Sequence, residues 1–136
     1  MSIASILRRR GTMACTVPPT ASITEVARLL AERRSGAVLV AEREPARRDQ
    51  VLGIVSERDI VRSLAKVGAA TLEMTAGQLM TRALRTAEPA TTLHEAMGLM
   101  TAGRFRHLPV FEHGTLVGLV SLSEVVEILA REPMAA

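Results

Sequence analysis

The sequence predicts an α/β protein, in the α+β arrangement, built from two β-α-β-β-α repeats. The same kind of helix start occurs twice at a fixed spacing, and each is followed by the same order of two strands and a second helix. The chain has 136 residues, of which 48% are apolar. That length suits a single compact domain or two halves of about 60 residues that share a core.

A capped helix follows the first short strand of each repeat. Ser22 with Glu25, and Thr92 with Glu95 70 positions later, form Ser/Thr-x-x-Glu capping boxes. The residues that follow are apolar at the spacing of one helix face. The sequence therefore predicts a similar amphipathic helix in each half.

Each of these helices is followed by a hairpin. The strands are expected at 37–40 and 51–55 in the first half, and at 108–111 and 116–120 in the second. His113 and Gly114 predict a tight turn in the second hairpin, whereas the Glu42–Gln50 loop of the first carries five extra residues. Insertions are tolerated in exposed loops, so this mismatch supports the alignment of the halves.

The second strand of each half runs directly into a helix that begins after Ser56 or Ser121. One repeat alone leaves an apolar face of its sheet uncovered, which explains why two occur together. The expected division is repeat 1 at 1–70, a linker with a short helix at 71–81, and repeat 2 at 82–136.

Composition argues against several classes of function. Cys15 is the single cysteine and the three histidines are scattered, so neither a disulfide nor a metal site is expected. No nucleophile or phosphate-loop motif occurs, so no catalysis is expected. No apolar run has the length of a membrane span, and a cytoplasmic location is expected.

Short arginine clusters, for example Arg33-Arg34 and Arg47-Arg48, leave two interpretations open at a net charge of +3. They are either solvated helix ends and loops or contacts to phosphates of a nucleotide or nucleic acid. The two phenylalanines and the lack of Trp and Tyr argue against a protein that stacks single-stranded bases.

Three segments make the chain resemble a known family: Thr16–Pro19, Gly53–Asp59 and Arg106–Val110. The second fits the pattern Gly-h-h-Ser/Thr-x-x-Asp, where h is apolar. The chain resembles the tandem cystathionine-β-synthase-type (CBS) domain pair, or Bateman module, and more narrowly the stand-alone bacterial CBS-pair proteins. The resemblance implies pseudo-twofold repeats whose sheets pack together and leave two clefts. It also implies adenosine ligands (AMP, ADP, ATP, sometimes NAD or S-adenosylmethionine) and homodimers.

Ser56 and Asp59 are the central candidates for ligand binding. The start of a helix favours an anion such as phosphate, Ser56 adds a hydroxyl donor, and Asp59 one turn later can accept from both ribose hydroxyls. The spacing alone equally describes a capping box in which both side chains serve the backbone. The resemblance favours ligand binding for Asp59, with Ser56 able to do both.

The resemblance places the adenine beside Thr16 and Val17, whose main chain would read its edge. Ala37 and Val38 would form an apolar wall for the base, and simple core packing explains them as well. For the phosphates, it points to Arg106 and His107.

Arg58 could add a cation from the first repeat. Arginine suits bidentate phosphate contacts, and His107 adds charge only when protonated. Arg104 and Arg106 could instead solvate a helix end.

A second, weaker site is expected around Thr86, Ala87, Ser121 and Glu124. Glu124 stands where the family prefers Asp, and a longer carboxylate would crowd the ribose. A capping role is therefore the favoured interpretation of Glu124.

These observations lead to a non-catalytic sensor of adenine nucleotides, read by an effector protein whose identity the sequence does not give. A module for oligomerisation or protein interaction that has lost its ligands is the alternative. Nucleic-acid binding through the arginines is a third, less favoured reading.

Overall fold

The computed structural model describes residues 1–10, 14–43 and 47–131. They fall into two compact units that do not follow chain order. Unit 1 combines Met1–Met13 with Arg85–Ala136, and unit 2 is Ala14–Leu84.

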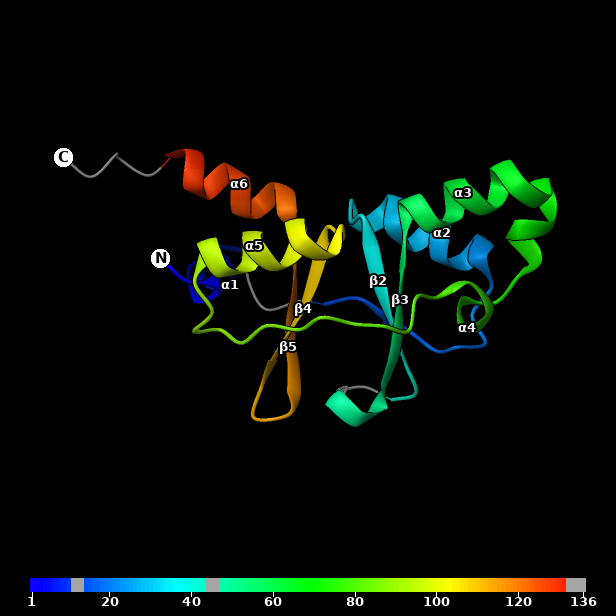
Figure 1. Cartoon of the computed structure of the whole chain (residues 1–136). Helices are drawn as coiled ribbons and strands as arrows, with labels where there is room; N and C mark the ends of the chain where they lie inside the picture. Colours follow the sequence, from blue (N-terminus) through cyan, green and yellow to red (C-terminus); the bar gives the residue numbers. More distant parts are fainter. Residues whose placement is uncertain (11–13, 44–46, 132–136) are drawn as a thin grey trace. The chain divides into compact units, whose positions relative to one another are not determined.

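Unit 2 holds a three-stranded sheet with helices packed on it (Figure 1). Its elements are β1 (Thr16–Val17), α2 (Ile23–Arg33), β2 (Ala37–Ala41), the 3-10 turn η1 (Arg48–Gln50), β3 (Val51–Ser56), α3 (Glu57–Val67), the 3-10 segment η2 (Gly68–Glu73) and α4 (Ala76–Leu79). β1 runs parallel to β2, and β2 is antiparallel to β3. The core of this unit packs apolar residues of β2 and β3 against α2, including Ile23, Val26, Val38, Val40 and Val55.

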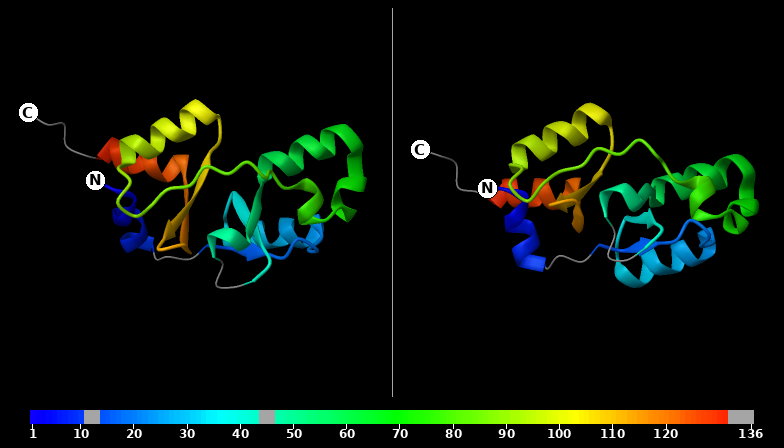
Figure 2. Two further views of the ribbon diagram at one scale, coloured as in Figure 1. Left: turned by 60° about the horizontal axis from the view of Figure 1, so that its bottom comes forward. Right: turned by 90° about the horizontal axis from the view of Figure 1, so that it is seen from below.

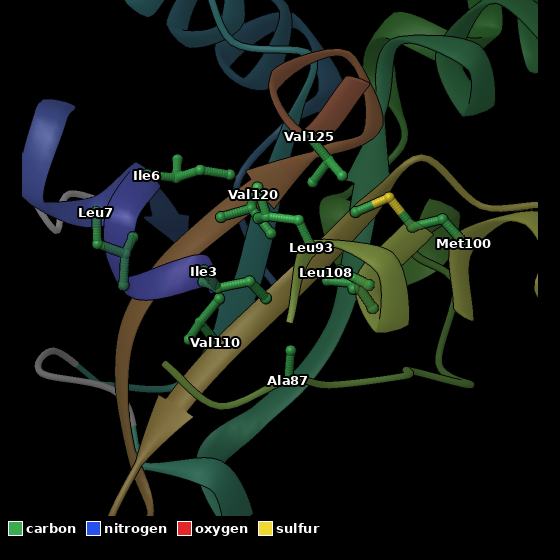
Figure 3. Close-up of a cluster of buried hydrophobic side chains, with 11 residues drawn as sticks. Ile3, Ile6, Leu7, Ala87, Leu93, Met100, Leu108, Val110, Val120 and Val125 are labelled. Carbon is green, nitrogen blue, oxygen red and sulfur yellow. The ribbon is translucent and has the colours of Figure 1, made fainter. Parts of the chain in front are cut away.

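Unit 1 repeats the plan with a hairpin. Its elements are α1 (Ile3–Arg10), α5 (Leu93–Gly103), β4 (His107–Glu112), β5 (Thr115–Ser121) and α6 (Leu122–Arg131). Ala87 pairs in parallel with Val110 of β4 as Val17 pairs with Val40 in unit 2, so residues around Ala87 occupy the place of β1. Figure 3 shows side chains from α1, α5, α6 and both strands meeting in one core.

The structure confirms the α/β class and the order of elements in the two repeats. Thr92 and Glu95 form the expected capping box at the start of α5, whereas Ser22 caps α2 through the Glu25 N–H without the return bond from the Glu25 side chain. His113 and Gly114 both have positive φ, 51° and 78°, as in the tight turns that join antiparallel strands. Residues 44–46 of the longer Glu42–Gln50 loop lie outside the described residues. The packing of the two sheets around clefts stays a prediction.

The helices that close the two units are exchanged between the repeats. The N–H of Ile3 donates to Thr91 O (2.8 Å), and the N–H of Ala76 makes the matching bond to Ala21 O (2.7 Å). Thus α1, at the start of the predicted repeat 1, packs on repeat 2, and α4, in the predicted linker, packs on repeat 1. Figure 2 shows α1, in blue, beside α5 and α6 in both views. The predicted division of the chain into 1–70, 71–81 and 82–136 stays a prediction about the repeats. The two compact units have other boundaries, because each includes the helix that precedes the other.

In each repeat, an arginine in a left-handed conformation ends the first helix. Arg34 (φ 51°, ψ 41°) and Arg104 (φ 57°, ψ 38°) are the C-caps of α2 and α5. This backbone region suits glycine, and a residue with a Cβ is strained there. Both arginines are exposed, so the described fold buries neither guanidinium.

We expect the fragment 14–84 to be more stable than the fragment 1–70, although the two have nearly the same length. The first includes α4, whose N–H groups of Ala76 and Gly77 donate to Ala21 O and Pro19 O, and the second lacks it. Urea unfolding followed by circular dichroism measures both. Equal stability of the fragments would contradict the exchange of closing helices.

Replacing either left-handed arginine by glycine should raise the free energy of unfolding by about 0.5–1 kcal/mol, because the strain is relieved. Arg33→Gly is the matched control. It lies one residue earlier, inside α2, and should lower stability by about the same amount. Urea denaturation of Arg34→Gly, Arg104→Gly and Arg33→Gly measures the three effects. Destabilisation by all three substitutions would contradict the relief of strain at Arg34 and Arg104.

Candidate functional site

The candidate site of unit 2 is built at the junction between β3 and α3. Ala37, the first residue of β2, pairs with Ser56, the last residue of β3. The N–H of Glu57 donates to Gly36 O at 2.9 Å, which ties the start of α3 to the segment before β2. The ladder therefore brings Ala37 and Ser56 together at the N-terminus of α3.

Ser56 and Asp59 form a complete capping box at this junction. The Ser56 N–H (2.8 Å) and Oγ (2.9 Å) both donate to Asp59 Oδ2, and the Asp59 N–H donates to Ser56 Oγ (3.2 Å). The capping interpretation of the Ser-x-x-Asp spacing is therefore confirmed. Both contacts to the carboxylate end on Oδ2, and Oδ1 receives no hydrogen bond from the residues that the structure describes.

The junction in unit 1 has the same construction with a glutamate. The Ser121 N–H (3.0 Å) and Oγ (3.1 Å) donate to Glu124 Oε1, and the Glu124 N–H donates back to Ser121 Oγ (3.2 Å). His107 pairs with Ser121 in the ladder, and the Leu122 N–H donates to Arg106 O at 2.7 Å. The longer side chain thus keeps the cap, as the sequence indicated for Glu124.

The apolar candidates lie mainly in the cores. Val17 and Val38 belong to the buried cluster of unit 2, so their side chains are occupied with core packing. Ala37 is fully buried beside them, and Thr16 is half-buried in β1. The core alternative is therefore confirmed for the Val38 side chain, while main-chain contacts from Thr16 and Val17 to an adenine stay a prediction.

Both main-chain groups of Ala87 form hydrogen bonds in the sheet of unit 1. Its N–H donates to Pro109 O, and its carbonyl accepts from the N–H of Phe111, each at 2.9 Å. An adenine edge in the weaker second site would therefore have to be read by the neighbouring Thr86 or by the second lone pair of the Ala87 carbonyl.

The candidate cations are divided between the units. Arg58 is exposed on the first turn of α3 in unit 2. Arg106, exposed, and His107, half-buried, belong to unit 1. Their meeting with Ser56 and Asp59 around one phosphate stays a prediction.

The sequence analysis missed the role of the two glycines in the Gly-h-h-Ser segments. A Cβ on Gly53 would lie 2.7 Å from Thr81 O and 2.8 Å from Met80 Sδ. A Cβ on Gly118 would lie 2.6 Å from Leu7 Cδ2. Each glycine is thus where the closing helix, or the residue after it, crosses the strand.

A signal for this exchange was present in the sequence. Ser2-Ile3-x-x-Ile6-Leu7 and Thr75-Ala76-x-x-Leu79-Met80 share a hydroxyl residue followed by small or apolar residues at the same spacing. These two segments lie before the parts of the repeats in which the similarity is clear, so the exchange was not predicted from the sequence.

Residues 1–10, 14–43 and 47–131 contain no group of three His, Cys, Asp or Glu side chains that could hold a metal ion. Among the helices of the same residues, none has the length and apolar character needed to cross a membrane.

Comparison with known families gives two matches along the chain, at residues 12–66 and 76–131, both to the CBS domain. The chain belongs to the CBS-domain family. The two matches correspond to the two repeats described above, so the tandem CBS pair expected from the sequence is confirmed.

Solved structures of CBS-domain proteins have the same fold. A CBS-domain containing protein from Agrobacterium tumefaciens is 38% identical, with a TM-score of 0.84 over 93% of this CBS pair and 91% of that chain. A putative signal-transduction protein with CBS domains from Burkholderia ambifaria is 31% identical, with a TM-score of 0.86 over 99% and 98%. A CBS domain protein from Pyrobaculum aerophilum, solved in complex with AMP, is 28% identical, with a TM-score of 0.77 over 97% and 100%.

Curated relatives are longer than this CBS pair. It spans 66% of a mitochondrial CBS domain-containing protein of Arabidopsis thaliana, to which it is 29% identical. It spans 24% and 62% of the next two relatives.

Asp59→Ala and Glu124→Ala should each lower the free energy of unfolding by about 1 kcal/mol, because each removes the carboxylate half of a capping box. Glu32→Ala, on the exposed side of α2, is the control and should change stability by less than about 0.5 kcal/mol. Urea unfolding measures all three. A loss for Asp59→Ala alone would mean that the two junctions are not equivalent.

Proposed function

We propose that this CBS pair is a regulatory module that binds an adenine nucleotide at the junction of β3 and α3 and catalyses no reaction. The family and the tandem repeat support a ligand-binding regulatory role. The likeness to the AMP-complexed protein of Pyrobaculum aerophilum, which extends over 97% of this chain, supports an adenine nucleotide.

The observation that carries the proposal is that Asp59 uses only one of its two carboxylate oxygens, Oδ2, for the capping box. Two hydrogen bonds to Oδ2 hold the group in one orientation at the first turn of α3. A carboxylate offers about four acceptor positions, so Oδ1 keeps its capacity to accept hydrogen bonds. The two neighbouring hydroxyls of a ribose are donors suited to such an oxygen, and the fixed orientation reduces the entropy lost on binding.

The remaining groups have roles that follow from their chemistry. Main-chain groups of Thr16 and Val17 would read the adenine. Phosphates would be neutralised by Arg58 in unit 2, and by Arg106 and His107 in unit 1. AMP, ADP, ATP and NAD all carry the adenosine that these contacts recognise.

Glu124 makes the second site the weaker one in this proposal. Its carboxylate forms the same cap as that of Asp59. Its extra methylene changes the space beside the cap, where a ribose would lie. We therefore assign the stronger binding to Asp59.

The regulatory part of the proposal requires a response to the ligand. A nucleotide shifts the conformation of the module only by as much as it binds one conformation better than another. The module would act as a homodimer in the cytoplasm, and an effector protein would read the shift.

One observation favours a second candidate function, a module for protein interaction without a ligand. Val61 and Val67 of α3 are 63% and 57% exposed, and Val126 of α6 is 46% exposed, so both second helices present apolar side chains to solvent. Exposed apolar surface of this kind is typical of protein contacts. A ligand raises the melting temperature by mass action, so a thermal-shift panel of AMP, ADP, ATP and NAD separates the two functions.

Asp59→Asn should weaken binding of AMP about 10- to 100-fold with little loss of stability. The amide oxygen of asparagine can keep the cap, whereas its NH₂ group replaces the acceptor offered to the ribose by a donor. Isothermal titration calorimetry measures the affinity, and urea unfolding measures the stability.

Glu124→Gln is the matched control, because it makes the same change in the cap of unit 1. It should leave the stronger binding unchanged. Equal affinity of wild type and Asp59→Asn would remove Asp59 from the site. If none of the four nucleotides bound to the wild type, the sensor function would be wrong.

A further inference from the structure

On the edge of β3 that faces away from β2, the main-chain groups of two residues are held by hydrogen bonds, with one residue between them. The Ile54 N–H donates to Thr81 O (3.0 Å), and the Thr81 N–H donates back to Ile54 O (2.8 Å). In an antiparallel ladder, alternate residues turn their main-chain groups to the same side. The next residue on this side is Ser56, whose N–H is held by Asp59 Oδ2.

The residue between these attachments is Val55, which is fully buried and pairs with Val38 of β2. Its backbone cannot move without disturbing the ladder. The orientation of the peptide groups at Ile54 is therefore linked to that at Ser56. Only Val55 separates them, which is the smallest separation at which two residues of a strand face the same edge.

Thr81 is also in close contact with β3. The ideal Cβ position of Gly53 lies only 2.7 Å from Thr81 O, so only glycine permits this approach. Beyond Thr81 the chain leads into unit 1, where both main-chain groups of Ala87 are bonded to β4. Residues 82–86 thus run between two main-chain anchors, and the first of them lies beside the candidate site.

We propose that the Thr81–Ile54 bridge is a clip for the linker and is energetically coupled to the Ser56–Asp59 box. A nucleotide that engages Asp59 tightens the clip and so changes how firmly the linker is held on unit 2. The coupling follows from the geometry of β3, and its control by a nucleotide rests on the proposed function.

The coupling is tested first without ligand, in the full chain. Ser56→Ala removes the hydroxyl of the box, and amide hydrogen exchange by NMR reports the clip through Thr81. Exchange at Thr81 should become about fivefold faster relative to the amides of Ala76 and Gly77, which bond to Ala21 O and Pro19 O. Ser121→Ala, the same change in unit 1, should leave this ratio unchanged.

An unchanged ratio in Ser56→Ala would overturn the coupling. So would equal acceleration at Thr81, Ala76 and Gly77, because that result reports loss of stability of the whole unit. Neither result depends on whether a nucleotide binds, so this arm is separate from the proposed function.

The second arm adds AMP. Exchange at Thr81 should slow about fivefold more than at Ala76 and Gly77. Because coupling is reciprocal, loosening the clip should weaken AMP binding by the same factor. Gly53→Ala forces Thr81 away, and Thr81→Pro removes the donor to Ile54 O without altering β3, which covers the case that Gly53→Ala does not fold.

Gly118→Ala is the matched control, since its Cβ would meet only the end of the Leu7 side chain. It should bind AMP as the wild type does. AMP binding that leaves Thr81 exchange unchanged, or equal AMP affinity in wild type and Thr81→Pro, would overturn control of the clip by nucleotide. Absence of AMP binding to the wild type would overturn the proposed function and, with it, that control, leaving the ligand-free arm to decide the coupling.

Discussion

In each repeat a single carboxylate holds the turn from the second strand into the second helix. It satisfies the N–H of the preceding serine and, through the serine hydroxyl, an N–H of the first helical turn. Helix starts leave such donors unpaired, and burial without a partner is costly. The position of α3 and α6 on their sheets, and hence of every group at the two junctions, depends on this reciprocal contact.

The same contact allows structural and ligand-binding roles to coexist in one side chain. Asp59 uses Oδ2 for the cap, and Oδ1 can still accept hydrogen bonds. The capping and ligand-binding interpretations of the Ser-x-x-Asp spacing are therefore not exclusive. Glu124 shows that the cap alone does not require aspartate. The fold therefore requires a carboxylate at this position and does not by itself require aspartate.

Much of the fold could be predicted from the sequence, because capping residues and short apolar strands are local signals that occur twice. The bulges after Val40 and Val110 could not, since they depend on how each hairpin meets its neighbours. The candidate residues Ser56 and Asp59 were found, but the close approach at Gly53 was missed. It depends on Thr81, which is distant in sequence and close in space.

The exchange of α1 and α4 has a consequence for the connectivity of this chain. Two separate copies of a single repeat, each lending its leading helix to the other, would have the same contacts as these two units. Such trading of identical elements between protomers is a low-cost route to a dimer. Joining the copies head to tail would give the present connectivity, so the chain has the connectivity of a swapped dimer whose two copies are covalently linked.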